Sequence, residues 1–335
     1  MSEIITAQAL RALVGEWLAK GRPVAGPSRV KPGLVAYAAI AKSDDLILDG
    51  FVHPSNSIKE FFFPRCERLY GYRIEGRKIE LTDPPAPDTE QIILGARPCD
   101  AAALPILDRL FNWDSRDDFY NRRRAATTVV TLACATHDQA CFCTSVGLAP
   151  DATEGADAIL VPAGERRYEV RALTDKGRAL FAGRTESATD AGRACDGPPV
   201  RFDAGRVREF LSANFESPVW AELTMRCLGC GSCAYVCPTC HCFDIEDEGA
   251  RAESATTSAG VRVKNWDSCQ FRMFTQHASG HNPRANQAQR QRQRLMHKFR
   301  VYPERFGAIL CTGCGNCTRA CPVSLGVAGV LEGLK

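Results

Sequence analysis

Short apolar runs, separated by turn residues, fill the first half of the chain and predict a β-sheet. Runs of four to eight residues with this spacing are typical of buried strands. The predicted strands are Gly33–Ile40, Tyr70–Ile74, Lys78–Leu81, Glu90–Leu94, Thr127–Leu132, Ala158–Val161 and Tyr168–Leu173.

Segments with apolar positions at helical spacing alternate with these strands. The first carries Leu10, Leu13 and Trp17 on one stripe. The predicted helices are Thr6–Lys20, Asp100–Phe111, Arg116–Arg124 and Asp175–Phe181. Alternating helices and strands predict an α/β or α+β domain over residues 1–182.

The pattern changes after residue 182. Gly183–Pro199 is small, polar and rich in Gly and Pro, which is typical of a boundary, so we expect a linker at 183–203. A helical pattern, Ala204–Asn214, then opens a second domain at 204–335.

The second domain contains one cysteine motif twice. The copies are Cys227-Leu-Gly-Cys230-Gly-Ser-Cys233-Ala-Tyr-Val-Cys237-Pro238 and Cys311-Thr-Gly-Cys314-Gly-Asn-Cys317-Thr-Arg-Ala-Cys321-Pro322. Each is the C-x2-C-x2-C-x3-C-P run of a bacterial-type ferredoxin, in which the fourth cysteine binds the other cluster. We therefore expect one 4Fe-4S cluster on Cys227, Cys230, Cys233 and Cys321, and a second on Cys311, Cys314, Cys317 and Cys237. The predicted domain is mainly helical, dicluster ferredoxin-like, with a long insertion at 238–310.

Other interpretations of these motifs explain less. Structural zinc needs four ligands, often as two doublets, and does not account for two quartets that each end in Cys-Pro. The Gly229-x-Gly231 and Gly313-x-Gly315 pairs fall inside the cysteine motifs, and no GxGxxG follows a predicted strand. We therefore expect no flavin and no NAD on this chain.

Composition narrows the class further. The chain has 335 residues, 45% of them apolar, and 17 cysteines, a number that favours metal binding over disulfides in a chain without signal-peptide features. We expect a cytoplasmic protein with no membrane span. Two clusters, each of charge about −2 with its thiolates, would cancel the formal charge of +3. The charge thus gives no support for nucleic-acid binding.

We interpret the basic run from Arg284 to Arg300 as a solvated helix face or a docking surface beside the clusters.

Nine cysteines lie outside the two motifs, and four of them follow predicted strands in the first domain. They are Cys99, Cys134, Cys141 and Cys143. Ligand sites of α/β proteins lie at strand ends, so these four could hold a third 4Fe-4S cluster. The alternative is that they are buried small apolar residues. Iron content would decide, with about twelve atoms per chain supporting a third cluster and about eight contradicting it.

A rival ligand set uses Cys240, Cys242 and Cys269 with Cys66 or a histidine such as His241 or His277. Cys240 and Cys242 directly follow the first ferredoxin motif, so they could instead line that cluster. We expect Cys195, in the linker, to be free, and the role of Cys66 stays open.

Several further motifs occur in a recognisable order. They are Gly95-Ala-Arg-Pro-Cys-Asp100, Cys141-Phe-Cys-Thr-Ser-Val-Gly147, Cys237-Pro-Thr-Cys-His-Cys-Phe243, Trp266-Asp-Ser-Cys269, Ser279-Gly-His-Asn282 and His297-Lys-Phe299. With both ferredoxin runs, the chain from about residue 90 onward resembles an iron–sulfur subunit shared by two systems. One is the beta subunit of cytoplasmic nickel–iron sulfhydrogenases, or NAD(P)-linked hydrogenases. The other is the electron-transfer subunit of anaerobic sulfite reductases.

The resemblance implies a non-catalytic subunit that relays single electrons. It implies an FAD- and NAD(P)-binding partner, nickel–iron small and large subunits, or a siroheme catalytic subunit in the sulfite reductase alternative. It also implies clusters beyond the two ferredoxin ones, and Cys99, Cys134, Cys141 and Cys143 match family cysteines, as do Cys240, Cys242 and Cys269. No catalytic constellation stands out, but a stand-alone reductase acting at the N-terminal cysteines is a third hypothesis.

Overall fold

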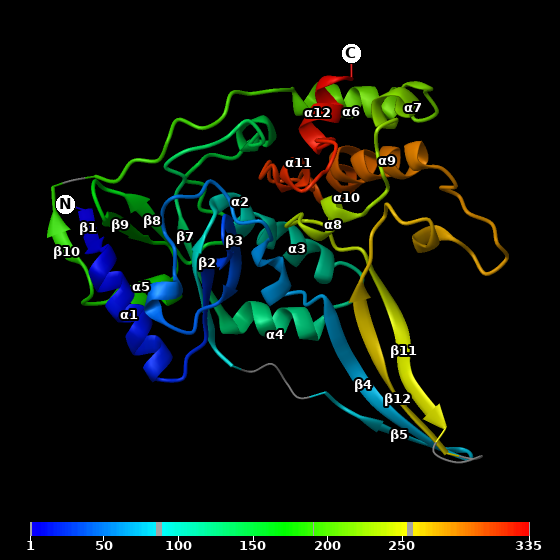
Figure 1. Cartoon of the computed structure of the whole chain (residues 1–335), viewed down its shortest axis with the longest axis horizontal. Coiled ribbons are helices and arrows are strands. Elements are labelled where there is room, and N and C mark those ends of the chain that lie inside the picture. Colours follow the sequence, from blue (N-terminus) through cyan, green and yellow to red (C-terminus); the bar gives the residue numbers. More distant parts are fainter. Residues whose placement is uncertain (1, 85–88, 190, 253–256, 335) are drawn as a thin grey trace.

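An eight-stranded mixed sheet organises the N-terminal half of the computed structural model, which describes residues 2–84, 89–189, 191–252 and 257–334 (Figure 1). Its order is β10-β1-β9-β8-β7-β6-β2-β3, in which β2, β6, β7 and β8 run parallel. The strands are β1 (Ser2–Thr6), β2 (Val24–Lys31), β3 (Leu34–Ala39), β6 (Gln91–Ala96), β7 (Thr127–Leu132), β8 (Ala158–Pro162), β9 (Arg167–Ala172) and β10 (Glu186–Ala188).

Helices cover both faces of this sheet. α1 (Ala7–Ala19) and α5 (Asp175–Phe181) pack on one face. α2 (Pro98–Ala101), α3 (Ala103–Phe111) and α4 (Asp118–Ala126) pack on the other. Along β7, Val130 joins the α1 side of the core and Val129 the α3 side. Because successive strand residues point to opposite faces, this apolar run is buried on both sides, which fixes its register.

A second, four-stranded antiparallel sheet forms an arm that projects from the body (Figure 1). It contains β4 (Cys66–Glu75), β5 (Lys78–Thr82), β11 (Phe243–Ala252) and β12 (Thr257–Trp266). At its base, the Lys264 ammonium contacts the carboxylates of Glu67 at 2.7 Å and Asp117 at 3.0 Å. Because β4 and β5 precede the predicted linker and β11 and β12 follow it, the arm joins segments on either side of that linker.

The C-terminal part packs short helices around the cysteine loops. They are α6 (Ala204–Ala213), α7 (Val219–Thr224), α8 (Ser232–Tyr235), α9 (Gln287–Met296), α10 (Tyr302–Phe306), α11 (Asn316–Arg319) and α12 (Val327–Glu332). A π-helical turn at His297–Val301 joins α9 to α10. Leu211, Trp220, Leu295 and Phe299 belong to the apolar cluster between these helices, which holds the cysteine loops in place.

The predicted mixed α/β class is confirmed, whereas a mainly helical C-terminal domain is not. The β11–β12 hairpin accounts for much of the difference. β11 is rich in Asp, Glu and Gly, which disfavour strands, and it forms here because it pairs with β12 along its length. β10 lies inside the segment expected as a linker and pairs with β1.

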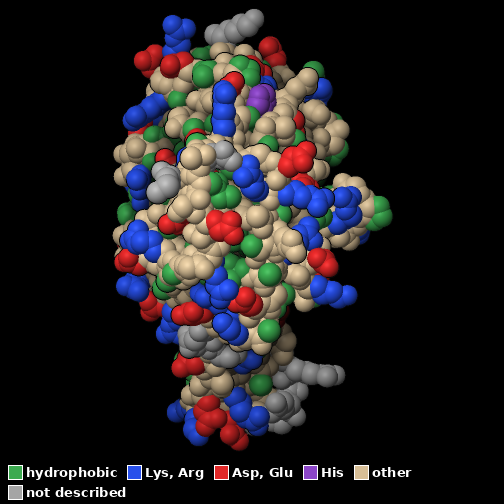
Figure 2. Space-filling view, turned by 90° about the vertical axis from the view of Figure 1, so that its left-hand side faces the viewer, with side chains coloured by type: hydrophobic (Ala, Val, Ile, Leu, Met, Phe, Trp, Pro, Cys, Tyr) green, Lys and Arg blue, Asp and Glu red, His purple; other side chains and the backbone are tan. Residues whose placement is uncertain are grey.

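Charged side chains of both signs are mixed over the face that Figure 2 shows, and the molecule narrows at one end toward the arm. Among the described helices, none has the length and apolar character needed to cross a membrane.

Candidate iron–sulfur centres

Both ferredoxin motifs contribute to a cavity that we call the first cavity. Cys227, Cys230 and Cys233 line it together with Cys321 from the second motif. The backbone N–H of Leu325 donates to Cys321 Sγ at 3.2 Å. The fold thus brings together the four cysteines that the crossed pattern groups.

The second cavity has the reciprocal composition. Cys311, Cys314 and Cys317 line it with Cys237 from the first motif. Val327 N–H donates to Cys317 Sγ at 3.4 Å. The hydroxyl oxygen of Thr312, which also lines this cavity, is buried without a hydrogen-bond partner among the described residues.

Glycines let other loops approach the second motif closely. Gly313 has φ +65°, and a Cβ there would lie 2.5 Å from the Cys143 N and Cα atoms. Its carbonyl oxygen accepts a hydrogen bond from Phe142 N–H at 2.9 Å. Glycine is required because an L side chain would be strained and would displace the Cys141–Cys143 loop.

The third cavity lies in the N-terminal domain, where β6 and β7 end. The cysteines that line it are Cys99, Cys134, Cys141, Cys143 and Cys195. Cys314 of the second cavity also lines it. The four cysteines predicted from strand ends therefore meet, and two segments that sequence reasoning did not connect with them join the site.

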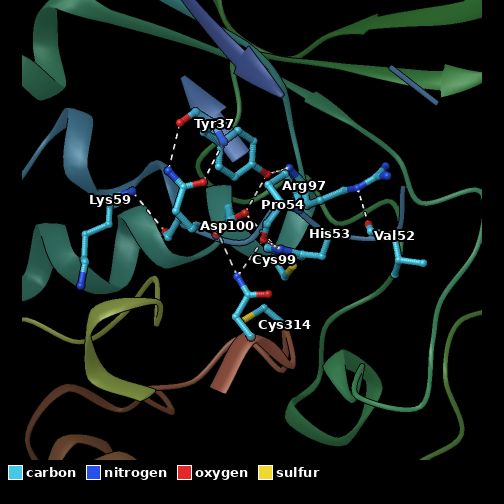
Figure 3. A network of polar contacts seen from close by, with 12 residues as sticks. Tyr37, Val52, His53, Pro54, Lys59, Arg97, Cys99, Asp100 and Cys314 are labelled. Atoms are coloured by element: carbon cyan, nitrogen blue, oxygen red, sulfur yellow. Dashed lines mark hydrogen bonds and ion pairs between the residues drawn. The ribbon is translucent and has the colours of Figure 1, made fainter. Parts of the chain in front are cut away.

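Cys99 belongs to a buried polar network (Figure 3). Its Sγ lies 3.4 Å from His53 Nε2, which is 3.2 Å from Asp100 Oδ2. Asp100 in turn accepts from the Tyr37 hydroxyl at 2.8 Å. His53 Nδ1 faces the Pro54 carbonyl oxygen at 2.8 Å. Because a carbonyl only accepts, Nδ1 carries a proton.

Cys141 makes different contacts. Its Sγ accepts from Arg319 Nη2 at 3.0 Å and donates to Asp138 Oδ1 at 3.4 Å. Arg319 also pairs with both Asp138 oxygens, at 2.7 and 2.9 Å. Burial opposes ionisation of this carboxyl, but the hydrogen bonds and charge of Arg319 outweigh it and hold the pKa of Asp138 at about 2. Asp138 is thus a carboxylate at neutral pH.

Two buried cations, Lys298 and Arg294, line the second cavity. Lys298 Nζ is 3.4 Å from Cys237 Sγ and donates to the Leu310 carbonyl oxygen at 2.9 Å. Burial disfavours its charge, yet the electrostatic effect of the facing cysteine sulfurs, that of Cys237 first, raises the pKa of Lys298.

Glutamine amides face the first cavity. Gln291 Nε2 donates to Cys227 Sγ at 3.0 Å, and Gln287 Nε2 donates to the same sulfur at 3.3 Å. Donors to a ligand sulfur are a common means of tuning a metal site.

The basic run that contains these residues is not a solvated face. Gln291, Arg294 and Lys298 are buried. With Gln287 they occupy positions i, i+4, i+7 and i+11, which form one helix face. This helical spacing of polar residues was the signal in the sequence, but polar residues at that spacing usually mark a solvated surface.

The cysteines of the rival ligand set form two separate pairs. Cys240 pairs with Cys237 of the first ferredoxin motif, and Cys242 pairs with Cys269. A hydrogen bond from the Cys240 thiol lowers the pKa of Cys237, and one from Cys242 lowers the pKa of Cys269 to about 6. Cys66 is exposed at the start of β4, and His277 is an exposed loop residue. His241 is half-buried beside His297, with the ring centroids 5.3 Å apart, and desolvation of its ring lowers its pKa to about 3.

Burial also raises the pKa values of cysteine thiols in the three cavities. It raises the pKa of Cys233 to about 11, Cys311 to about 12, Cys134 to about 12 and Cys143 to about 11. Without iron these thiols keep their protons at neutral pH, and metal binding releases them. Grouped thiols, amide donors to sulfur and buried cations together fit anionic iron–sulfur clusters.

Comparisons with known proteins agree with this geometry. Residues 226–325 match the family described as a 4Fe-4S dicluster domain. The class is therefore an iron–sulfur protein that transfers electrons.

A relative points to a particular kind of subunit. The chain is 29% identical over 313 residues to the sulfhydrogenase 2 subunit beta of Pyrococcus furiosus, covering 89% of this chain and 88% of that protein. The resemblance to sulfhydrogenase beta subunits that the motifs predict is thus confirmed. No solved structure matches the chain.

Proposed function

We propose that this chain relays single electrons through three 4Fe-4S clusters, one in each cavity. The eight ferredoxin cysteines would hold the first two in the crossed arrangement, and the third cavity would hold the third. A bound cluster accepts and releases one electron at a time. The protein side chains around it would set its potential and orientation.

The observation that carries this proposal is the shared cysteine between cavities. Cys314 lines both the second and the third cavity. Between the first and second cavities, Cys233 lies close enough to Cys317 for the charge of one thiolate to raise the pKa of the other. These contacts support a single route in which electrons would pass through the first, second and third cavities in that order.

The buried cations support the same interpretation. Arg294 interacts with Cys233 of the first cavity and Cys317 of the second, and Lys298 lies beside Cys237 of the second. Their charges would offset the cost of adding an electron to the nearby clusters. Cys240, Cys242 and Cys269 adjoin this region and stay candidates for additional ligands.

The partners follow from the sulfhydrogenase resemblance. We propose a cytoplasmic complex in which an FAD- and NAD(P)-binding subunit exchanges electrons with this chain, and nickel–iron small and large subunits lie at the other end of the route. Copurification from the native host under anaerobic conditions would identify these subunits. A siroheme subunit in their place would favour the sulfite reductase alternative.

A direct test uses the isolated chain. Dithionite should reduce it and bleach its visible absorbance, and the full chain should contain about twelve iron atoms. NAD(P)H should reduce it only after the flavin subunit is added. Rapid reduction by NAD(P)H of the isolated chain would contradict the proposed division of roles.

One observation favours the stand-alone reductase as a second candidate. A hollow lined by Phe51, Val52, Arg97, Thr136 and Tyr168, among others, adjoins the third cavity and shares Val52 and Thr136 with it. It lies at the carboxyl ends of β6, β7 and β8, where α/β proteins bind ligands. Oxidation of the reduced, isolated chain by a small substrate would support this candidate over the relay.

A further inference from the structure

The first cavity lies at the surface of the protein. Cys230, which lines it, is an exposed cysteine, whereas Cys314 and Cys317 of the second cavity are buried. Leu228 and Pro322 also line the first cavity, and both are exposed. A cluster held there would therefore be within reach of an electron carrier bound at the surface.

Exposed apolar side chains lie close to this opening. Met225 and Met273 are 81% and 73% exposed, more than any other large apolar side chain that the structure describes. Met225 lies two residues before the first motif, and Met273 lies three residues after Gln270, which lines the cavity. The ring of Phe271 packs against Gly231, where a Cβ would lie 2.6 Å from it, so this segment is held against the first motif. Exposed apolar side chains that gather in one place mark interaction sites, and methionine adapts its shape to a partner.

Three arginines gather on the Cys227 side of the cavity. Arg226 and Arg272 are exposed, and Arg226 adjoins Cys227 in the chain. Burial lowers the pKa of Arg290, and its guanidinium is close enough to Cys227 and Arg272 for both to change that pKa as well.

The segments that build the cavity contain no acidic residue. Neither Asp nor Glu occurs in residues 223–243, 268–303 or 305–331, although the chain has 39 acidic residues among 335. Glu222 and Asp267 border the first two of these segments. Even when both are counted, the three arginines leave the opening with a positive charge.

Compensation of cluster charge accounts for the buried cations but not for the exposed arginines. Arg294 is buried and acts directly on Cys233. The charges of exposed side chains are screened by water and salt over about 10 Å, and they act on molecules that approach from solution. A second copy of this chain would bring like charges together, so the surface favours an acidic partner.

We propose that the opening of the first cavity, formed by Met225, Leu228 and Met273 with Arg226 and Arg272, is the docking site of an acidic electron-carrier protein. Apolar contacts combined with complementary charge are typical of small, transient electron-transfer interfaces. One electron would pass from the reduced carrier to the first cluster, with no bond formed or broken. This inference rests on the proposed cluster in the first cavity and adds a soluble acidic carrier to the proposed partner subunits.

The test measures electron transfer from a reduced acidic 2Fe-2S ferredoxin to the oxidised holoprotein by stopped-flow absorbance under anaerobic conditions. The second-order rate constant should fall about tenfold as salt rises from about 0.02 to 0.3 M. Arg272→Glu should slow the transfer about tenfold at low salt and much less at high salt. Met273→Ser should slow it at both salt concentrations, because salt does not screen an apolar contact.

Two controls separate docking from other effects. Arg29→Glu makes the same change of charge at an exposed position of β2, and it should change the rate less than about twofold. Reduced methyl viologen is a small cation, so it should reduce Arg272→Glu at least as fast as the unaltered chain. A loss seen only with the ferredoxin therefore reports docking and not a changed cluster potential.

Absence of electron transfer from the ferredoxin, or a rate that neither salt nor Arg272→Glu changes, would overturn the proposal. So would an equal loss in Arg29→Glu. A dimer of the chain that Met273→Ser dissociates would assign the surface to a second copy instead. Absence of the ferredoxin-type cluster signals from the unaltered chain would refute the proposed function itself, which the iron content and the spectra report separately from the rates.

Discussion

Replacing Gln291 by leucine should lower the reduction potential of the cluster proposed for the first cavity. The Gln291 amide donates to Cys227 Sγ at 3.0 Å. Reduction adds negative charge to the cluster and its thiolates, so an N–H donor stabilises the reduced state more than the oxidised state. Removing the donor therefore makes reduction harder.

The magnitude follows from the strength of such bonds. A hydrogen bond contributes about 1 kcal/mol when both groups are neutral and about 2 kcal/mol when one is charged. If reduction strengthens the Gln291 bond by about 1 kcal/mol, the potential falls by about 40 mV, because 59 mV corresponds to about 1.4 kcal/mol for one electron. Gln287 donates to the same sulfur at 3.3 Å, so part of the stabilisation would remain.

A redox titration followed by electron paramagnetic resonance would measure the shift. Gln293→Leu is the matched control, since Gln293 is on the same helix and less buried. A first-cavity potential within about 10 mV of the unaltered chain would refute the reasoning. So would an equal shift in the control.

Three further predictions concern ligation, packing and pH. Cys237→Ser should remove the spectroscopic signal of the second cavity, and loss of the first-cavity signal would show instead that each motif closes on itself. Gly313→Ala should cost at least about 3 kcal/mol in denaturant unfolding, because its Cβ would meet Cys143. Gly15→Ala, which meets nothing within 4 Å in α1, should gain up to about 1 kcal/mol, and similar effects of the two changes would contradict this. Burial, with the charges of Lys298 and Arg284, lowers the pKa of His297 to about 4. Below about pH 6.5 the unfolded chain therefore binds more protons than the folded chain, so the folded state loses stability as the pH is lowered. His297→Phe should remove about 1.4 kcal/mol of the stability lost between about pH 7.5 and 5.5, and an unchanged pH dependence of unfolding would contradict it.

Elements with a strong local pattern were predictable from the sequence. Thr127–Leu132 is β7 and Asp175–Phe181 is α5, each with the predicted bounds. The predicted helix Asp100–Phe111 divides into α2 and α3, with Cys99 inside α2. β1 was missed because Ile4 and Ile5 also fit the helical stripe of the segment that follows.

Elements that depend on distant partners were not predictable in this way. β11 has an acidic sequence with little strand preference, and it is a strand because it pairs with β12. The face of α9 that carries Gln291 and Arg294 is polar and still buried. Gln291 Nε2 donates to the Cys227 sulfur and Arg294 Nη2 to the Cys233 carbonyl oxygen, both in another segment, which no local pattern reveals.

The sequence alone identified the two ferredoxin motifs and the class of protein and predicted their crossed grouping, because the bacterial ferredoxin motif has a short and regular cysteine spacing. It also pointed to Cys99, Cys134, Cys141 and Cys143, because strand ends converge at one edge of a parallel sheet. Only the tertiary structure decided that Cys195 joins them and that Cys314 connects the second and third cavities. The segments that carry Cys195 and Cys314 reach the third cavity through packing and backbone hydrogen bonds. Because they lie far from the other cysteines in the sequence, no local pattern predicts this contact.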